Sequence, residues 1–303
     1  MSLTKNVSEK RILVVGELLV DIISDNNITS LACPTQFSAN QGGSSANLCA
    51  NLSWLGVKSE LVATVGNDNL GTFLINELKS AGVDYKHINR SANRQTSIVL
   101  VGKNEQTPDF IPYRNADLAI KRIDNSLLEP AIIIHTTAFA LSKEPARSNI
   151  LDALTKAAQM GKSISVDWNF APSIWQDEDG KDVFKKIIQL NPMLKISIDD
   201  LERFTGETLT IEQSIAWLDS LNTQIICLTC GKNGVWFKEK NDSWKHKSAI
   251  PVSLIASVTG AGDAFWAGFL AAFINEKSAE ESINEALKTA KLKIEKVSAL
   301  YKP

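Results

Sequence analysis

Short runs dominated by apolar residues alternate along the chain with longer stretches in which apolar residues recur at helical spacing. Such runs, bounded by polar or turn-forming residues, are typical of strands covered on both faces, as in a parallel sheet between two helical layers. The runs that predict buried strands are Ile12–Val15, Leu61–Val65, Ala131–Ile134, Ile164–Val166, Leu194–Ile198 and Ile225–Thr229.

The stretches between these runs carry recognisable helix signals. A glycine directly follows two predicted helices, Ala46–Leu55 and Arg147–Met160, where a residue that ends a helix is expected. Two further helices open with a Ser or Thr three residues before a Glu or Gln, at Thr210 and Ser278, which is the spacing of a capping box. Strands alternating with helices predict an α/β fold with a doubly wound, mostly parallel sheet flanked by helices.

Residues 24–40 and 96–114 do not fit this alternation, because they are polar with only scattered strand-forming residues. We interpret them as a small inserted β lid over one edge of the functional site. The length of 303 residues suits one large α/β domain with a small appendage. The chain, residues 1–303, is therefore predicted to be a single domain.

Charge and hydropathy narrow the classes of function. The formal net charge is −2, and no block of five or more like charges occurs, so neither a nucleic-acid nor a membrane surface is indicated. The apolar run Ala264–Ile274 has eleven residues, whereas a membrane-spanning helix needs about 20. The N-terminus has no apolar signal segment. We expect a cytoplasmic protein whose partners are small molecules.

The cysteines and histidines do not have the spacing of metal ligands. Cys227 and Cys230 form a C-x-x-C motif without a second pair, and Cys227 lies inside an apolar run, which favours burial as a small hydrophobic residue. His87, His135 and His246 are isolated in the sequence. His135 follows a predicted strand, and a structural role is favoured for it.

The most informative stretch for chemistry runs from Thr259 to Phe265 and continues into a strongly apolar helix. Its glycines let the backbone approach an anion closely, and a helix N-terminus offers N–H groups and a partial positive charge. Asp263 follows this turn directly. A carboxylate at a helix start stabilises the helix by itself, but beside an anion site it can also accept the proton of an attacking hydroxyl.

The segment Thr259–Asp263 resembles the T-G-A-G-D signature of the ribokinase-like, or PfkB-type, carbohydrate kinases. The resemblance implies that Asp263 is the catalytic base and that the backbone amides of Gly260, Ala261 and Gly262 form the anion hole. The motifs of this family appear in family order and span nearly the whole chain, with fructokinase and 2-keto-3-deoxygluconate kinase members most similar. The resemblance implies a ribokinase-like fold and an ATP-dependent sugar kinase.

Three motifs resemble the sugar-binding parts of this family. Gln41–Asn47 resembles G-G-x-x-x-N, although a simple tight turn before a helix would give the same pattern. Gly16–Asp21 resembles G-E-x-L-x-D and is expected to close the first strand, with a solvated strand-end aspartate as the alternative. Tyr113 and Arg114 resemble the Y-R-x-x-A motif of the lid, with an exposed arginine as the alternative. The resemblance assigns sugar binding to Asp21, Gly42, Gly43, Asn47, Tyr113 and Arg114.

Three other motifs resemble the nucleotide side of the family. The first is Asn169–Pro172, which resembles the N-x-A-P of ribokinases. The loop after the strand Ile225–Thr229 is similar to T-x-G-x-x-G, and it also fits a β-hairpin turn. The segment 195–206 resembles K-x-N-x-x-E-x-x-x-x-x-G, with Ser for Asn and Asp for Glu, and helix capping would explain the same residues. The resemblance assigns the nucleotide side to Asn169, Ser197, Asp200, Thr229, Gly231 and Gly234. Asp200 is also the candidate for indirect contact with Mg²⁺.

Two departures from the family pattern bear on substrate and cofactors. Ala171 stands at the arginine position of the D-x-N-x-R-x-x-x-W run that Asp167–Trp175 resembles. In 2-keto-3-deoxygluconate kinases this arginine helps to handle anionic groups, so its absence argues against an acid sugar. Ser257 stands where many relatives have an aspartate that helps to bind a monovalent cation, which argues against activation by K⁺.

These observations give a hypothesis of ATP- and Mg²⁺-dependent phosphorylation of a primary hydroxyl of a neutral monosaccharide such as fructose. A 2-keto-3-deoxygluconate kinase is the nearer alternative, because Glu17, Asp21, Tyr113 and Arg114 fit it while Ala171 does not. A sensor that binds sugar or nucleotide without catalysis is an alternative of another class. A homodimer formed through the lid would fit the family.

Overall fold

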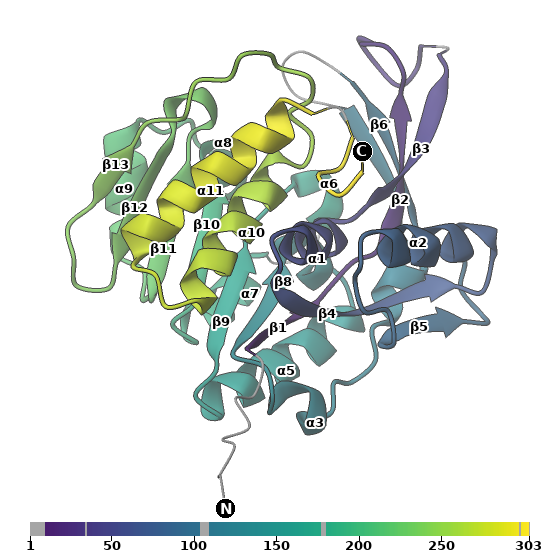
Figure 1. Cartoon of the computed structure of the whole chain (residues 1–303), viewed down its shortest axis with the longest axis horizontal. Coiled ribbons are helices and arrows are strands. Elements are labelled where there is room, and N and C mark those ends of the chain that lie inside the picture. Colours follow the sequence, from purple (N-terminus) through teal and green to yellow (C-terminus); the bar gives the residue numbers. More distant parts are fainter. Residues whose placement is uncertain (1–9, 34, 104–108, 177–179, 297, 303) are drawn as a thin grey trace, which may run out of the picture.

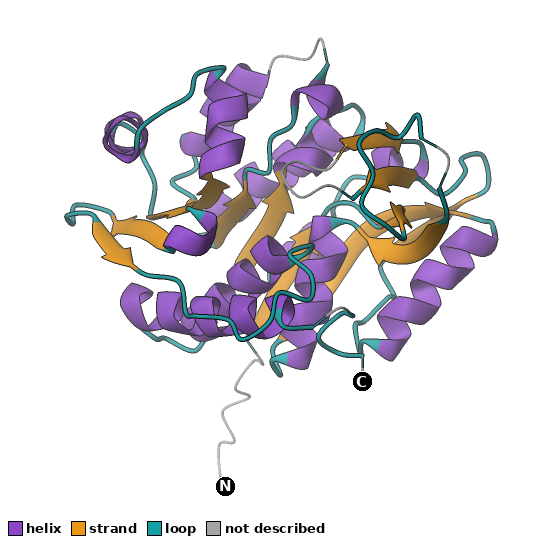
Figure 2. Cartoon of the chain, turned by 90° about the horizontal axis from the view of Figure 1, so that it is seen from above, coloured by secondary structure: helices purple, strands orange, loops and turns teal. Residues whose placement is uncertain are grey.

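The computed structural model describes residues 10–33, 35–103, 109–176, 180–296 and 298–302. Seen from above, a central sheet lies between two layers of helices (Figure 2). This arrangement confirms the predicted α/β class. Residues 34 and 104–108, which belong to the two segments interpreted as a lid, lie outside the described residues.

The main sheet has a strand order of β13-β12-β11-β10-β9-β8-β1-β4-β5 in the described part of the chain (Figure 1). Its strands are β1 (Arg11–Val15), β4 (Lys58–Gly66), β5 (Ile88–Ser91), β8 (Ile133–Thr137), β9 (Ser163–Asp167), β10 (Met193–Ser197), β11 (Ile225–Thr229), β12 (Val235–Glu239) and β13 (Lys245–Lys247). All neighbours pair in parallel except β11–β12 and β12–β13. The strand order reverses between β1 and β8, and ligands bind at such a switch point in open α/β sheets.

Helices cover both faces of this sheet and create two separate cores. Ile12 and Val14 of β1 join one core, and Leu13 and Val15 join the other, because successive side chains of a strand point to opposite faces. The first core includes side chains from α1 (Ser44–Trp54), α2 (Asn69–Ser80), α10 (Ala261–Ile274) and α11 (Ala279–Ile294). The second includes side chains from α3 (Asn125–Leu128), α4 (Ala138–Leu141), α5 (Ala146–Gln159), α6 (Pro172–Trp175), α7 (Gly180–Ile188), α8 (Ile198–Thr205) and α9 (Ile211–Asp219).

A smaller sheet extends beyond the main one, beside α2 at the upper right of Figure 1. Its strands, in spatial order, are β3 (Phe37–Gly42), β2 (Leu19–Ser24), β6 (Ile98–Gly102) and β7 (Asp109–Tyr113). The smaller sheet therefore begins at Leu19, whereas the sequence placed Asp21 at the end of the first strand. That placement was wrong: β1 ends at Val15, and Asp21 lies inside β2, paired with Asn40 and Val99.

Most predicted elements are present, with shifted ends. The strand predicted at Ala131–Ile134 is β8, Ile133–Thr137, because three polar residues at its end are buried and hydrogen-bonded. His135 is one of them and meets Ser165, which supports its structural role. The capping boxes at Thr210 and Ser278 are both formed. Helices α1 and α5 end next to Gly56 and Gly161, both left-handed, as predicted.

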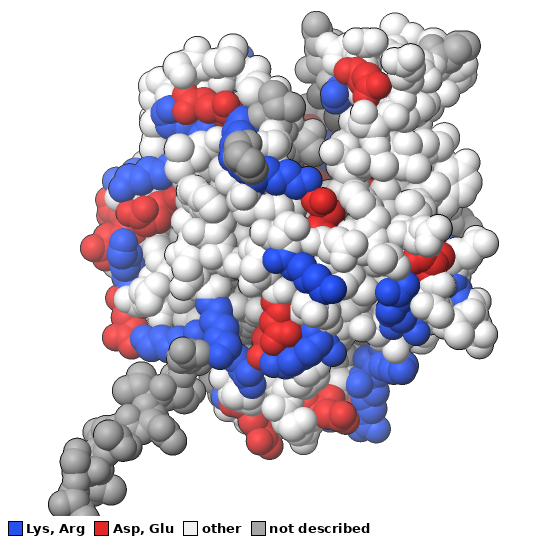
Figure 3. Space-filling model, turned by 45° about the vertical axis from the view of Figure 1, so that its right-hand side comes forward, with Lys and Arg blue, Asp and Glu red and all other residues white. Residues whose placement is uncertain are grey.

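The charged side chains, the lengths of the helices and the cysteines are further features of the fold. On the face drawn in Figure 3, Lys and Arg are interspersed with Asp and Glu, so neither charge dominates. Within the described ranges, every helix is too short or too polar to cross a bilayer. Cys227 and Cys230 are buried and unpaired, as their apolar setting predicted for Cys227.

Candidate active site

The glycine-rich loop before α10 has the geometry that the sequence predicted. Gly260 adopts a left-handed φ of 75° and stands at the N-terminus of α10, a conformation that other residues adopt only with strain. Ala261 and Gly262 form the first turn of this helix. The first N–H groups of a helix have no partner within it, and the partial positive charge there attracts anions. The Ala261 amide donates to the Val258 carbonyl at 3.1 Å, so the loop can hold a phosphate group through its other amides.

Asp263 lies half-buried in the first turn of α10, and Asn47 of α1 orients it. The side-chain amide Nδ2 of Asn47 donates a hydrogen bond of 2.9 Å to Oδ2 of Asp263. Gln41 in turn donates from Nε2 to Oδ1 of Asn47, also at 2.9 Å. The chain of hydrogen bonds fixes which face of the Asn47 amide meets the carboxylate, and leaves Asp263 in a defined orientation.

The environment of Asp263 suits a general base near neutral pH. Burial raises the pKa of its carboxyl from the usual value to about 7, and the negative charge of Asp167 acts in the same direction. The hydrogen bond from Asn47 and the charge of Lys195 lower the pKa and limit the rise. A catalytic base is most effective when its pKa lies near the working pH.

Asp21 and the Gly42-Gly43 turn lie together, as the resemblance implied. A Cβ on Gly42 would stand 2.3 Å from the Asp21 carboxyl, so only glycine fits beside this side chain. Burial raises the pKa of Asp21 to about 7, and the charges of Asp263 and Glu17 contribute. The effect of the Asp263 charge on the pKa of Asp21 indicates that the two carboxyls lie near each other. Gly43, with a φ of 94°, precedes α1, so the tight turn of the alternative interpretation is also present.

Glu17 is a buried carboxyl behind this turn. It accepts hydrogen bonds from the hydroxyls of Thr137 at 2.7 Å and Ser45 at 3.0 Å, and from the Ser45 amide at 3.2 Å. Burial raises its pKa against these hydrogen bonds. Glu17 thereby links the loop after β1 to β8 and to the start of α1, on both sides of the switch point of the sheet.

A buried ion pair lies beneath the anion-binding loop. Nζ of Lys195 in β10 lies 2.8 Å from both carboxylate oxygens of Asp167 at the end of β9. A Cβ on Gly262 would stand 3.2 Å from the same Nζ, which places the lysine against the loop. Burial alone would lower the pKa of Lys195. The negative charge of Asp167 acts in the opposite direction, and the pKa of Lys195 is raised. Sequence reasoning did not select Lys195, although a lysine inside a predicted buried strand is a detectable signal.

The loop after β11 turns directly into β12. Thr229 ends β11, Gly231 and Gly234 have positive φ values, and β12 returns antiparallel to β11. A Cβ on Gly234 would stand 2.0 Å from the carbonyl oxygen of Lys247, so the glycine is needed for the close approach of β13. The hairpin interpretation is therefore correct, and it leaves the loop at the same edge of the sheet as β9 and β10.

Ser197 and Asp200 form the N-terminal cap of α8. The Ser197 hydroxyl accepts a hydrogen bond from the Asp200 amide at 3.0 Å, and lies 2.5 Å from its carboxylate. Arg203 donates to the other carboxylate oxygen at 3.0 Å. Burial raises the pKa of Asp200 to about 6, while the charge of Lys195 opposes the shift. The capping interpretation holds, and the carboxylate remains one that an added cation would stabilise.

Asn169 connects three elements near the start of α1. Its side chain accepts a hydrogen bond from the Phe139 amide and donates one to the Ser44 hydroxyl, both at 3.1 Å. Asn169 follows β9, Phe139 lies in α4 and Ser44 begins α1. The residue predicted for the phosphate side thus lies beside the turn that carries Gly43.

Tyr113 and Arg114, at the end of β7, have different environments. Tyr113 is 55% exposed, whereas the Arg114 side chain is 8% exposed. Arg114 forms an ion pair with Asp117 at 2.6 Å, donates to the Ser142 hydroxyl and lies over the ring of Phe139. The alternative of an exposed lid arginine is therefore wrong. The charge of Arg114 is already neutralised by Asp117.

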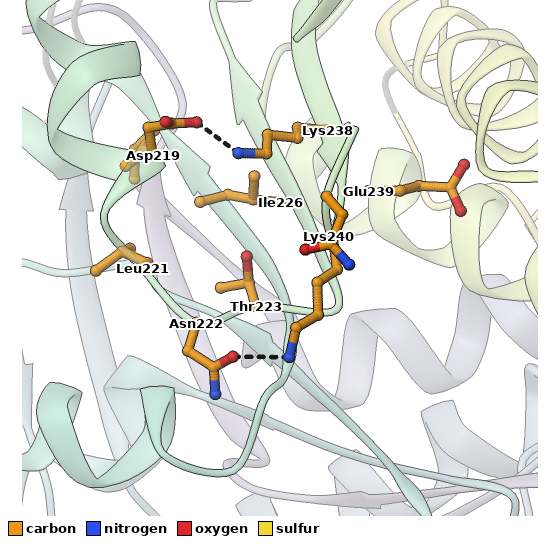
Figure 4. A pocket seen from close by; sticks show the side chains of 10 residues that line it. Asp219, Leu221, Asn222, Thr223, Ile226, Lys238, Glu239 and Lys240 are labelled. Carbon is orange, nitrogen blue, oxygen red and sulfur yellow. Dashed lines mark hydrogen bonds and ion pairs between the residues drawn. The ribbon is translucent and has the colours of Figure 1, made fainter. Parts of the chain in front are cut away.

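The pocket drawn in Figure 4 is unrelated to this site. It is lined by residues of α9, β11, β12 and the adjoining loops. Asp219 pairs with Lys238 at 2.5 Å, and Lys240 donates to Asn222 at 2.9 Å (Figure 4). None of the residues singled out from the sequence lines it.

Residues 9–302 match the pfkB family of carbohydrate kinases. The ATP-dependent 6-phosphofructokinase of Thermoanaerobacterium thermosaccharolyticum is 32% identical over 292 residues, which cover 95% of this chain and 89% of the relative. The fructokinase of Klebsiella pneumoniae is 32% identical over 266 residues, 86% of this chain and 83% of the relative.

Solved structures give the same result. The fructokinase of Halothermothrix orenii superposes with a TM-score of 0.83 at 30% identity, over 92% of this chain and 98% of that one. A sugar kinase of Pyrococcus horikoshii in complex with ATP superposes with a TM-score of 0.83 at 26% identity, over 96% and 95% of the two chains.

The fold and the site thus define a ribokinase-like sugar kinase, with a glycine-rich helix N-terminus beside a half-buried carboxylate. The chain belongs to the pfkB family of carbohydrate kinases, and it is an ATP-dependent sugar kinase.

Proposed function

We propose that this enzyme transfers the γ-phosphoryl group of ATP to a primary hydroxyl of a neutral monosaccharide, with fructose as the first candidate. The observation that carries the proposal is the bond between Asn47 and Asp263 beside the Gly260–Gly262 loop. Asp263 removes the hydroxyl proton, the sugar oxygen forms a bond to the γ-phosphorus, and the bond to the oxygen bridging the β- and γ-phosphates breaks, which releases ADP.

The amides of the loop stabilise the charge that develops on the transferred group, and their effect is greatest where water is excluded. The sugar hydroxyls are bound in this proposal by Asp21, Gly42, Gly43 and Asn47. Tyr113 and Arg114, at the end of β7 of the smaller sheet, also contact the sugar. Asn169, Ser197, Asp200, Thr229, Gly231 and Gly234 serve the nucleotide.

The charge of the pocket supports a neutral sugar. The charges of Asp263 and Glu17 act on Asp21, so a carboxylate or phosphate that belongs to the sugar and is bound at Asp21 would be repelled. The cation expected to offset such repulsion, Arg114, is paired with Asp117. Ala171 provides no charge, as the sequence indicated. These features disfavour 2-keto-3-deoxygluconate, which carries a carboxylate.

Fructose 6-phosphate is a second candidate, because the 6-phosphofructokinase relative covers nearly the whole chain at 32% identity. Its phosphate lies at the far end of the sugar from the hydroxyl that would react, and it would have to find a cation away from the three carboxylates. A sensor without activity is disfavoured, because residues 9–302 match a family of carbohydrate kinases.

Mg²⁺ fits the site as a partner of ATP. Asp200 is a carboxylate whose charge is disfavoured by burial, so a cation held nearby through water would stabilise it. Bound Mg²⁺ neutralises charge on the phosphate oxygens. Ser257, whose hydroxyl accepts a hydrogen bond from the Thr259 amide at 3.3 Å, has no charge to offer a monovalent cation, and we propose that K⁺ is not required.

We also propose that two copies associate through their smaller sheets. Ile111 and Tyr113 of β7 and Phe37 of β3 are exposed apolar side chains on this sheet, at 41%, 55% and 37% exposure. A dimer by light scattering that I111K converts to monomer would support this assembly, and a wild-type monomer would contradict it. The cytoplasm, where ATP is available, is the proposed location.

The deciding experiment is ADP release with Mg-ATP and fructose, ribose, tagatose, 2-keto-3-deoxygluconate, fructose 6-phosphate or a nucleoside. Strong turnover with one neutral sugar, lost in D263N, supports the proposal. Turnover only with an acid sugar or a sugar phosphate would contradict the neutral substrate. Silence with every sugar, together with nucleotide binding, would favour the sensor.

A further inference from the structure

Lys293 occupies an unusual place for a lysine. The buried residues of α11 form a stripe at helical spacing that includes Ile283, Ala286 and Leu287 and ends at Lys293. Among the buried residues described for this helix, Lys293 alone is charged, and its exposure is 8%. A buried lysine at a position that faces a neighbouring helix is rarely found without a charged partner, so it requires an explanation.

Close packing of α10 and α11 fixes where Lys293 lies. A Cβ on Gly268 of α10 would stand 2.5 Å from the Thr289 hydroxyl and 2.8 Å from the Glu285 carbonyl, so the two helices nearly touch there. The helices run antiparallel and side by side (Figure 1). One turn beyond Thr289, Lys293 therefore reaches the N-terminus of α10.

At that N-terminus, Lys293 packs against the anion-binding loop. Its Cε would lie 3.6 Å from a Cβ on Gly260. Lys195 lies near another residue of the same loop, Gly262. The two lysines differ in one respect: Lys195 is paired with Asp167, whereas the ion pairs of the described residues include no carboxylate for Lys293. Its ammonium donates instead to the carbonyl oxygen of Lys296 at 3.2 Å.

Burial lowers the pKa of the Lys293 ammonium, while the negative charge of Asp263 counteracts the shift. Lys296 is the other charged group that acts on it, and it adds to the lowering. The charge of Lys293 is therefore only partly compensated. A phosphate oxygen is a stronger hydrogen-bond acceptor than a carbonyl oxygen, since charge-assisted bonds are shorter and stronger.

We infer that Lys293 is a phosphate-binding residue, which exchanges its bond to the Lys296 carbonyl for a phosphate oxygen of ATP held at the Gly260–Gly262 loop. The inference rests on the proposed function, because it needs the nucleotide phosphates at this loop. It adds a cation from the C-terminal helix to a site otherwise built from the glycine loop and the strand ends.

The test compares wild-type protein with K293M and K293R by calorimetry, using a non-hydrolysable ATP analogue and AMP, and by kinetics. Loss of one charge-assisted bond should weaken analogue binding about tenfold in K293M, with AMP affinity changed less than about twofold. K293R, which keeps the charge, should bind the analogue within about threefold of wild type. K288M is the matched control, because Lys288 of the same helix is exposed and pairs with Glu285.

Methionine suits a buried helix stripe, so K293M should unfold at the same urea concentration as wild type or a higher one. Equal loss of analogue and AMP affinity, or unchanged analogue affinity, would overturn the inference. If K293M unfolds early, K293R decides: wild-type stability with tenfold weaker analogue binding would contradict the role, and retained binding would support it. Wild-type protein that binds the analogue but phosphorylates no sugar would refute the proposed function, and leave the test of Lys293 intact.

Discussion

Asn47 and Asp263, 216 positions apart in the sequence, meet through a hydrogen bond of 2.9 Å between Nδ2 and Oδ2. One residue comes from the first helix and the other from the start of α10, on the same face of the sheet. The bond joins the two strongest motifs of the sequence into one constellation. The bond also lowers the pKa of Asp263, although the Asn47 side chain does not itself titrate.

Replacement of Asp263 by Ala or Asn should remove most turnover, because no other group accepts the hydroxyl proton at this place. The expected loss in kcat is about a thousandfold, within the range for a general base. Binding of the ATP analogue, measured by calorimetry, should change less than about threefold. Turnover within tenfold of wild type would rule Asp263 out as the base.

The activity should rise with pH through the neutral range. Asp263 must be deprotonated to act, and its pKa is raised to about 7, so kcat/KM should increase up to that pH and level off above it. Asp21, raised to about 7 by burial and by the charge of Asp263, should contribute to the same limb. A value of kcat/KM that stays constant from about pH 5.5 to about pH 8.5, roughly 1.5 units on either side of this pKa, would contradict the prediction.

N47A should move this limb to higher pH, because the hydrogen bond from Asn47 lowers the pKa of Asp263. We expect about tenfold lower kcat near pH 7, with partial recovery at higher pH. N76A, which changes an exposed asparagine of α2, provides the control. A uniform loss at every pH would show that Asn47 acts on something other than the proton affinity of Asp263.

Stability should respond to pH with the opposite sign. The folded state holds the Asp263 proton more tightly than the unfolded chain, so that stabilisation is present at low pH and is lost as pH rises from the unfolded pKa near 4 to the folded pKa of about 7. D263N removes this cost, and should raise Tm by about 2 °C or more at pH 8 but less at pH 4.5. Scanning calorimetry at the two pH values measures the difference, and an equal change at both would contradict the linkage.

Breaking the Lys195–Asp167 pair should destabilise the fold. K195M leaves the Asp167 carboxylate buried without a partner, which should cost about 3–5 kcal/mol in free energy of unfolding. The double variant D167N/K195M should recover part of this loss, because no uncompensated charge remains. Urea unfolding checks both. A single variant as stable as wild type would show that water or another group replaces the partner.

G42A should impair sugar binding selectively, because the added methyl would displace the Asp21 carboxyl that lies 2.3 Å from it. We expect kcat/KM for the sugar to fall by about a hundredfold, as for a misplaced binding group, with the KM for ATP little changed. Steady-state kinetics in both substrates separates the effects. Equal effects on sugar and ATP would indicate general disruption of the turn before α1.

Local sequence signals determined the class of fold and the chemistry of single motifs. Short apolar runs such as Ile225–Thr229, bounded by turn residues, predict buried strands, and the box from Ser278 to Glu281 caps a helix by contacts within four residues. The Gly260–Asp263 turn carries its own signal, because glycines directly before a helix start form a pattern that the sequence shows by itself. The sequence located the Gly42-Gly43 turn and Asn47 for the same local reason.

Tertiary structure alone decided which partners meet and what each group experiences. Asp21 lies in a strand of the second sheet because pairing with β3 and β6, far along the chain, outweighs its nearness to β1. The sequence left open whether Arg114 is exposed, and only the fold shows that Asp117, Ser142 and Phe139 enclose it. Burial and long-range charges set the pKa of Asp263, and helix packing brings Lys293 to Gly260. Such effects depend on distances in space, which spacing along the chain does not encode.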